Sequence, residues 1–326
     1  MMTAVPAAKG ASHVRTSETD EQFHLRAIAA FALLLMVAPF FVYPVFVMKF
    51  LCFALFALAF NLLLGFGGLL SFGHAAFFGS ASYISAHAAK VWGLTPELAI
   101  IAGTATACIL GLIFGWLAIR RQGIYFAMIT LALSQMIYFI ALQARFTGGE
   151  DGIQAVPRGM LFGILDIGSD FALYWVVLAI FLGGLLLIHR VIYSPFGQVL
   201  KAVRENEARA ISLGYNTDRY KLLVFVLSAT ISGTAGATKA IVLQIASLTD
   251  VHWSMSGEVV LMTLVGGLGT IFGPIVGALV VVLMQSYLAH LGAWIVVIQG
   301  MIFVVAVLLF REGIIGVLAR LTRRPL

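Results

Sequence analysis

Long apolar stretches dominate this chain and restrict its possible folds more than any other feature. Ten can be separated, at residues 27–44, 48–64, 67–89, 97–119, 123–143, 171–189, 222–243, 257–270, 271–289 and 294–310. A helix needs about 20 mostly apolar residues to cross a bilayer, and several of these stretches meet that length. With 326 residues, 61% of them hydrophobic and 10% charged, and a mean hydropathy of +1.04, the chain is too apolar for a water-soluble domain. We therefore predict an all-α, polytopic membrane bundle of about ten transmembrane segments.

The basic residues predict the orientation of this bundle. With both termini in the cytoplasm, most of the 20 Lys and Arg residues fall on that side, and the outer face keeps only Lys49, Lys90, Arg145, Arg158 and Lys239. Such a bias follows the positive-inside rule. Treating residues 257–289 as one span would put the Arg-rich C-terminus outside, so this stretch is divided in two. We expect a cytoplasmic tail at 1–26, a transmembrane domain at 27–310 and a second cytoplasmic tail at 311–326.

Two glycine-rich interruptions have similar sequences. Each has a Gly-Gly-Leu followed by a Phe-Gly, and each joins an inward-going segment to an outward-going one in this topology. The residues expected to break helices are Gly67, Gly68 and Gly73 in the first, and Gly266, Gly267, Gly269, Gly273 and Pro274 in the second. A duplicated half is common in transporters, and the free N–H groups of half-helices suit a substrate carboxylate. Chance recurrence and simple close packing of helices are the alternatives.

A polar, basic segment interrupts the apolar pattern at residues 190–221. From Val199 to Leu213, a helical wheel gathers one mostly apolar face, made of Val199, Ala202, Val203, Asn206, Ala210 and Leu213. Leu200 and Ile211 form a second, smaller apolar contact. Ser194-Pro195 predicts the start of this helix, and Gly214 predicts its end. We therefore expect one amphipathic helix on the cytoplasmic side.

The charges of this helix indicate what it contacts. Glu205 and Glu207 would be repelled by an anionic lipid surface, and apolar flanks on two sides suit a groove on a protein. An interfacial helix resting on lipid is the alternative. Docking to a protein is favoured.

Polar residues within the apolar segments are candidates for a substrate pathway, because buried polar groups are costly in a bilayer. The candidates are Asn61, Ser71, His74, Tyr125, Thr130, Gln135 and Glu258, with Ser134 and Gln244 as weaker ones. Hydroxyl groups also form hydrogen bonds between helices without any role in transport. Glu258 follows Ser256-Gly257, where it would cap a helix or face the outer mouth of the pathway.

The segment at 145–170 forms an outer loop. It contains Thr147-Gly148-Gly149-Glu150-Asp151-Gly152 and later Asp166 and Asp170. This acidic, Gly-rich composition suits a docking surface for a soluble binding protein. An ordinary solvated loop is the alternative.

Several kinds of chemistry find no support in the sequence. Cys52 and Cys108 lie in apolar runs, and no His, Cys or acidic residues have the spacing of a metal site or a catalytic triad. We therefore expect no enzyme activity, metal or cofactor. The chain also has no GxxxxGK[ST] motif, so any ATP that drives it must be bound by a separate protein.

Several long stretches resemble one family of membrane proteins. GFGGLLSFGHAAFFGSASYISA, RQGIYFAMITLALSQM, FTGGEDGIQAVPRG, SPFGQVLKAVRENEARAISLGYNTDRYKLLVF and SGEVVLMTLVGGLGTIFGPIVGA occur in the family's order, from about Leu62 to Gly316. They are similar to the LivM-type permease subunits of ABC importers for branched-chain amino acids. The family's EAA-plus-Gly signature is met only loosely by Glu207-Ala208-Arg209 and Gly214. The whole loop at 190–221 is therefore assigned to coupling with the ATPase.

This resemblance implies the partners and the substrate. They are two ABC ATPase subunits that bind ATP, a second permease of LivH type, and a periplasmic or lipid-anchored binding protein, in a bacterial inner membrane. The implied substrates are branched-chain or related hydrophobic amino acids.

Other functions remain as alternatives. The same machinery carries urea, short amides or aromatic amino acids in related permeases. An ion- or proton-coupled secondary transporter would require ionisable residues near mid-membrane, where only His74 is expected. A scaffold without transport activity would not need an amphipathic cytoplasmic helix.

Overall fold

A computed structural model of the chain describes residues 10–161, 163, 165–288, 294–309 and 313–322. The outermost residues of both predicted tails, and the ends of the ninth and tenth predicted segments at Ala289 and Phe310, lie outside this part. Within the predicted C-terminal tail, Gly313–Thr322 forms the helix α13.

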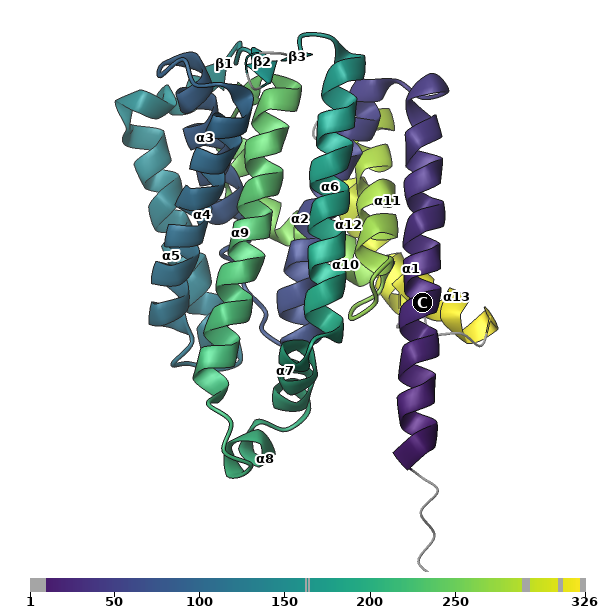
Figure 1. The fold of residues 1–326 in the computed structure, drawn as a ribbon. Helices are drawn as coiled ribbons and strands as arrows, with labels where there is room; N and C mark the ends of the chain where they lie inside the picture. Colours follow the sequence, from purple (N-terminus) through teal and green to yellow (C-terminus); the bar gives the residue numbers. More distant parts are fainter. Residues whose placement is uncertain (1–9, 162, 164, 289–293, 310–312, 323–326) are drawn as a thin grey trace, which may run out of the picture.

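The described chain is a helical bundle (Figure 1). Ten helices correspond to the ten predicted apolar segments: α1 (Gly10–Val37), α2 (Pro44–Asn61), α3 (His74–Lys90), α4 (Pro96–Ala118), α5 (Ile124–Gln143), α6 (Asp170–Tyr193), α9 (Thr217–Leu243), α10 (Trp253–Gly266), α11 (Gly273–Tyr287) and α12 (Trp294–Leu309). Short helical turns follow α1 (Ala38–Phe40) and α2 (a π-helical turn, Leu62–Phe66), and three more lie in loops: Arg145–Thr147, Gly149–Asp151 and Leu248–Asp250. The predicted all-α, polytopic membrane fold is confirmed.

The helices differ in length, and the short ones flank the glycine breaks. By length and composition, five described helices can cross a membrane: Pro44–Phe66, Pro96–Ala118, Ile124–Gln143, Asp170–Tyr193 and Thr217–Leu243. In contrast, α3, α10 and α11 have 17, 14 and 15 residues. At 1.5 Å per residue they are about 21–26 Å long, less than the ~30 Å hydrocarbon core.

One predicted boundary is corrected at the first break. The third segment was expected to begin at residue 67, but its helix begins only at His74. Gly68 has a φ of +70°, in the left-handed region, and a right-handed helix cannot continue through that conformation.

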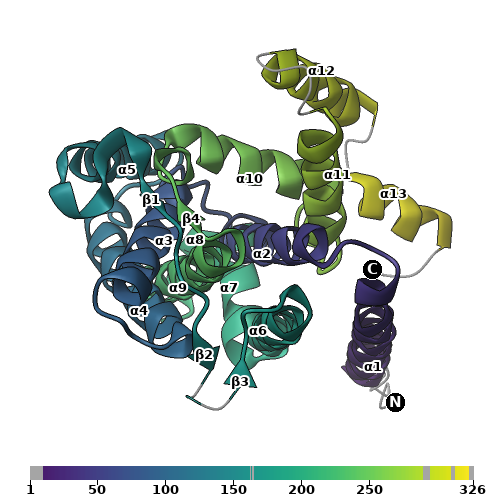
Figure 2. The ribbon, with the colours of Figure 1, turned by 90° about the horizontal axis from the view of Figure 1, so that it is seen from above.

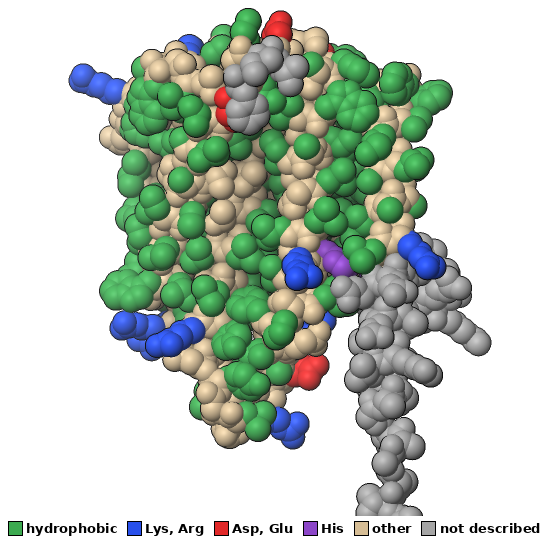
Figure 3. Space-filling view, in the orientation of Figure 1, with side chains coloured by type: hydrophobic (Ala, Val, Ile, Leu, Met, Phe, Trp, Pro, Cys, Tyr) green, Lys and Arg blue, Asp and Glu red, His purple; other side chains and the backbone are tan. Residues whose placement is uncertain are grey.

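Two short helices, α7 (Pro195–Glu205) and α8 (Glu207–Ser212), mark one end of the bundle. This end is at the bottom of Figure 1 and is called the lower end; the opposite one is the upper end. Figure 3 shows apolar side chains over the face between the two ends, with Lys and Arg side chains gathered at the lower end. The surface therefore has the apolar band and basic margin of a membrane protein.

The core of the bundle is formed around α2. In its apolar window 89% of the residues are buried, against 28% for α5. Figure 2 shows α2 in the middle of the bundle, with α9 and α6 on one side and α10 on the other. A helix that is apolar on all sides suits either a protein interior or a lipid environment, and α2 (PVFVMKFLCFALFALAFN) has that character and lies in the interior.

Small residues allow α3, α4 and α9 to pack closely. A Cβ atom on Gly236 of α9 would meet the backbone of Phe78 in α3, and one on Gly233 would meet the side chain of Ala107 in α4. Between helices in lipid there is no water to expel, so close van der Waals packing of this kind is a main source of their association.

The upper end carries two small β-ladders, which the all-helical prediction did not include. β1 (Ile153–Gln154) pairs with β4 (Ile245–Ala246), and β2 (Met160–Leu161) pairs with β3 (Leu165–Asp166), both antiparallel. Arg158 forms an ion pair with Asp170 at 2.6 Å and donates a hydrogen bond to the Val242 carbonyl at 3.1 Å. The loop at 145–170 is therefore fastened to α6 and α9.

A buried ion pair lies near the upper end of α9. Lys239 and Asp250 are 5% and 2% exposed, and Lys239 Nζ lies 2.6 and 2.8 Å from the two carboxylate oxygens. Asp250 also accepts a hydrogen bond from the Ser247 N–H at 3.3 Å. The pair therefore joins α9 to the turn that leads into α10.

Breaking this pair should destabilise the fold. We expect Lys239→Met to lower the free energy of unfolding by about 3–5 kcal/mol, because it leaves a buried carboxylate without its partner. The double change Lys239→Met/Asp250→Asn should recover much of the loss. Thermal unfolding of the purified protein in detergent measures the effect. Lys90→Met is the control, since that exposed lysine donates one hydrogen bond, to the Gln154 carbonyl; equal losses in both single variants would contradict the prediction.

Candidate coupling and translocation site

The segment predicted as one amphipathic helix is two helices, which corrects that prediction. α7 ends at Glu205 and α8 begins at Glu207, and Asn206 between them has a φ of −156° and a ψ of 95°. The Asn206 side chain accepts a hydrogen bond from the Arg209 N–H at 3.0 Å. Asparagine is a preferred helix N-cap, and here it starts a new helix instead of continuing the old one.

This break changes which apolar residues face outward. Val203, Ala210 and Leu200 are 4%, 2% and 1% exposed, so they pack against the chain's own bundle. Leu213 and Ile211 are instead 69% and 56% exposed. Figure 1 shows α8 as the part of this loop farthest from the bundle. Of the other residues predicted to couple to the ATPase, Val199 and Glu207 are half-buried, and Ala202, Asn206 and Gly214 are exposed.

Glu207 fastens α8 to its neighbours. Its Oε1 accepts hydrogen bonds from Lys221 Nζ at 2.5 Å and Thr217 Oγ1 at 3.2 Å, and its Oε2 accepts one from Gln122 Nε2 at 2.9 Å. Lys221 is 4% exposed. A charge-assisted cluster of this kind holds α8 against the first turns of α9 and the turn after α4.

Arg204 connects α7 to both glycine breaks. Its Nη1 donates a hydrogen bond to the Gly65 carbonyl in the π-helical turn after α2. Its methylene groups lie beside Gly68, so a Cβ there would contact Arg204 Cγ, and its Nη1 lies beside Gly269 in the second break. Arg204 therefore touches both places where the membrane helices are interrupted.

A cavity of about 470 Å³ lies at this junction. Its lining residues are Phe66, Lys201, Arg204, Glu205 and Gly269. Lys201 Nζ lies 5.7 and 5.8 Å from the ring centres of Phe66 and Tyr193. Burial lowers the pKa of the Lys201 ammonium from its ordinary value. The cavity thus combines two cationic groups with one carboxylate beside both breaks.

The second break is held by Asn61, a predicted pathway residue. Its Nδ2 donates to the Thr270 carbonyl at 2.8 Å, and its Oδ1 accepts from the Gly269 N–H at 2.9 Å. Thr270 Oγ1 accepts from the Gly273 N–H at 3.0 Å, and Pro274 follows in the first turn of α11. Asn61 is 2% exposed and serves the backbone of the break.

The first break is held in the same manner, by its own Ser71 and by side chains of two helices. Ser71 Oγ accepts from the Gly73 N–H at 3.1 Å, and Thr130 Oγ1 of α5 accepts from the Phe72 N–H at 3.1 Å. Ser256 Oγ of α10 donates to the Phe72 carbonyl at 2.8 Å and accepts from the Ala75 N–H at 2.9 Å. In both breaks a hydroxyl side chain accepts a hydrogen bond from the N–H of the Phe-Gly glycine, which is the residue before α3 in the first break and the first residue of α11 in the second, and this extends the similarity seen in the sequence.

His74 lies in an aromatic enclosure. It is fully buried, and its Nε2 is 2.8 Å from Ser228 Oγ, which donates to the Ala59 carbonyl at 2.5 Å. The rings of Phe60 and Phe77 lie 4.9 and 5.7 Å from the imidazole. These contacts join α2, α3 and α9 and support a structural role.

The remaining predicted pathway residues lie apart from the breaks. Tyr125 is 68% exposed in the first turn of α5, and Gln135 is partly exposed farther along the same helix. Glu258 accepts a hydrogen bond from Gln285 Nε2 at 2.8 Å. Its expected capping role is corrected, because α10 begins at Trp253 and His252 Nδ1 caps it by accepting from the Ser254 N–H.

Several residues of this site were missed in the sequence. Ser228, Ser256, Thr270 and Lys221 hold the breaks and the loop, and Arg204 was assigned only to the charged face of the loop helix. One signal in the sequence could have found part of this site. A hydroxyl residue lies two or three positions before the glycine of each Phe-Gly pair, at Ser71 and Thr270. The others depend on contacts between residues more than 100 positions apart or, for Lys221, on the break at Asn206.

The geometry is accompanied by similarity to known proteins. The family described as "Branched-chain amino acid transport system / permease component" matches residues 44–307. The high-affinity branched-chain amino acid permease LivM of Escherichia coli is 26% identical over 247 residues, 69% of this chain and 57% of that protein. The chain thus matches a little over half the length of that relative.

Other relatives carry different names. The ribose import permease RbsC of Bacillus subtilis is 28% identical over 238 residues, 68% of this chain and 70% of that protein. A probable branched-chain amino acid permease LivH of Methanocaldococcus jannaschii is 23% identical over 225 residues, 64% of this chain and 68% of that protein. No solved structure matches this chain.

The family match covers eleven α-helices, from the first residue of α2 to the last turns of α12, with both glycine breaks and the whole α7–α8 loop between them. The chain belongs to the family of permease components of branched-chain amino acid transport systems.

Proposed function

We propose that this chain is the membrane-spanning permease subunit of an ATP-driven importer, with its lower end in the cytoplasm of a bacterial inner membrane. The observation that supports this proposal most directly is the exposure of Ile211 and Leu213. Their side chains are 56% and 69% exposed on the loop that projects from the basic end of the bundle. Exposed apolar side chains in water mark a docking site for a protein. The partner proposed for this surface is an ABC ATPase.

Energy reaches the membrane domain through Arg204 in this proposal. Closure of two ATPase subunits moves α8 and, with it, α7, since Asn206 alone separates the two helices. Arg204 passes the movement to Gly65 and to the second break. Short helices on either side of a break can then tilt, which opens the bundle alternately to each side.

The proposed cargo is a branched-chain or related hydrophobic amino acid. The family description and the name of the LivM relative support it. The cavity beside Lys201, Arg204 and Glu205 has both charge signs that a zwitterionic amino acid requires, and we assign it to the exit of the pathway. Urea, amides and aromatic amino acids remain the alternative cargoes, and the ribose permease relative indicates that related chains carry chemically distant substrates.

The remaining partners follow from the family. They are a second, LivH-type permease and a periplasmic or lipid-anchored binding protein. The upper loop supports docking of the latter through its exposed acidic residues Glu150, Asp151 and Asp166. The ligand profile of the binding protein encoded beside this gene tests the cargo: a protein that binds no hydrophobic amino acid contradicts it.

The docking surface is tested by Ile211→Asp/Leu213→Asp. An apolar anchor buried at an interface contributes about 2 kcal/mol, so losing two should reduce ATP-driven uptake into vesicles and retention of the ATPase at least tenfold. Ala208→Asp is the matched control, because it adds a charge at an exposed position of α8 and keeps both anchors. Undiminished uptake with full retention of the ATPase in the double variant contradicts the docking assignment.

The proposed coupling through Arg204 is tested by Arg204→Met. Removal of the guanidinium leaves the Gly65 carbonyl without its donor, at a cost of about 1–3 kcal/mol, and uncouples α7 from the breaks. We expect the ATPase to stay bound, while substrate carried per ATP hydrolysed falls at least fivefold. Arg190→Met, an exposed residue at the end of α6, is the control. A normal ratio of transport to hydrolysis in Arg204→Met shows that the coupling takes another route.

A further inference from the structure

A groove of about 150 Å³ opens between α4 and α9 at their lower ends. Its lining residues are Gly115, Trp116, Ile119, Arg120, Asp218, Arg219 and Leu222. Gly115, Ile119 and Leu222 supply apolar surface, and the charged residues lie just after the end of α4 and in the first turn of α9. The groove therefore passes from apolar to charged at the level where the membrane helices end.

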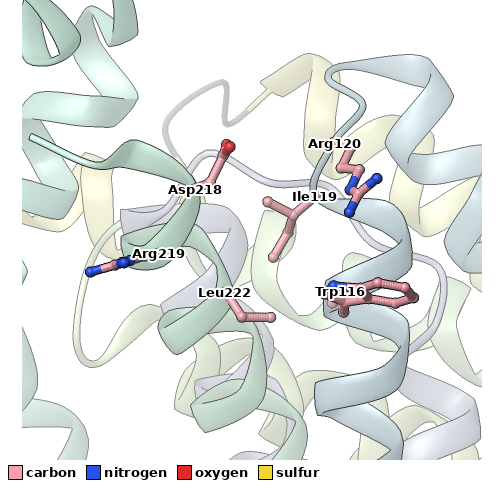
Figure 4. Close-up of a pocket in the computed structure, with 7 residues that line it drawn as sticks. Trp116, Ile119, Arg120, Asp218, Arg219 and Leu222 are labelled. Carbon is pink, nitrogen blue, oxygen red and sulfur yellow. The ribbon is translucent and has the colours of Figure 1, made fainter.

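The mouth of the groove carries both signs of charge on opposite walls. Figure 4 shows Trp116 on α4, Arg120 on the chain just after that helix, and Asp218 and Leu222 on α9, with Ile119 between them; Arg219 points away. The Arg120 guanidinium lies 5.3 Å from the centre of the Trp116 ring, a cation–π contact that orients it. One cation and one anion thus face the same small space.

These charges have no partners within the part of the chain that the structure describes. None of the three ion pairs found there includes Arg120 or Asp218, and both side chains are exposed. Trp116 is 59% exposed, and tryptophan is enriched at the level of lipid headgroups.

We propose that this groove binds phosphatidylethanolamine, a zwitterionic phospholipid with a primary amine. The lipid phosphate pairs with Arg120, and its ammonium group donates hydrogen bonds to the Asp218 carboxylate. The acyl chains extend along Leu222 and Ile119 toward the apolar face between α4 and α9. This site requires that the chain lies in a membrane and does not depend on its transport function.

The chemistry of the two walls distinguishes this lipid from others. Phosphatidylglycerol has a phosphate for Arg120, but its net negative charge is repelled by Asp218. Phosphatidylcholine has both charges, but its quaternary ammonium has no N–H to donate to a carboxylate. Bound selectively, a lipid here joins the ends of α4 and α9 beside the Gln122–Glu207 hydrogen bond.

Native mass spectrometry of the full-length chain in detergent, with the three lipids at equal concentrations, tests the proposal. Phosphatidylethanolamine should bind about fivefold more tightly than either other lipid, the factor expected for one favourable charge at a membrane surface. Arg120→Gln should weaken all three lipids. Asp218→Asn should remove the preference over phosphatidylcholine and raise the binding of phosphatidylglycerol.

Arg121→Gln is the matched control, because Arg121 is the next residue, is exposed and does not line the groove. It should leave the lipid preference unchanged, and circular dichroism should show equal helix content in all variants. Equal binding of the three lipids, preference for phosphatidylglycerol, or equal effects of Arg120→Gln and Arg121→Gln overturn the proposal. Displacement by free phosphoethanolamine at the same concentration also overturns it, since the apolar part of the groove would then contribute nothing.

Discussion

Hydrogen bonding of interrupted backbone inside the membrane is the constraint on which this structure depends. A bilayer core offers no water to N–H and C=O groups, so a helix can be broken there only if the protein itself supplies their partners. Asn61, Ser71, Thr130, Ser256 and Thr270 supply them at the two glycine breaks. Each of these five side chains forms a hydrogen bond with the backbone of a break.

This arrangement brings the breaks and the cytoplasmic loop into one unit. The π-helical turn after α2 leaves the Gly65 carbonyl available, and Arg204 of α7 occupies it while its side chain lies beside Gly68 and Gly269. The same helix contributes Lys201 and Glu205 to the cavity at that point. The loop for which we propose a partner outside the membrane is therefore in direct contact with the two glycine breaks.

Sequence reasoning succeeded where the signal was local. Runs of apolar residues predict the ten segments, and Gly-Gly pairs predict the interruptions between them. The charges predict that the basic loop residues lie at one end of the bundle. It failed at Asn206, because a helical wheel assumes that the helix continues, whereas the side-chain cap on Arg209 makes a second helix start there. Val203 and Ala210 consequently face the bundle, and Ile211 and Leu213 form the exposed surface.

By itself, the sequence determined that the chain enters a membrane as an all-α bundle, how its loops divide by charge, and that it has no phosphate-binding loop of its own. These properties depend on composition and on short motifs. Only the tertiary structure decided the roles of single polar residues, since those depend on neighbours far away in the chain. Lys239, for example, is expected near the outer face from its position, but Asp250 allows it to be buried there. Asn61 has the sequence context of a pathway residue. In the structure its Oδ1 accepts a hydrogen bond from the Gly269 N–H, 208 positions away, and so it holds the second break.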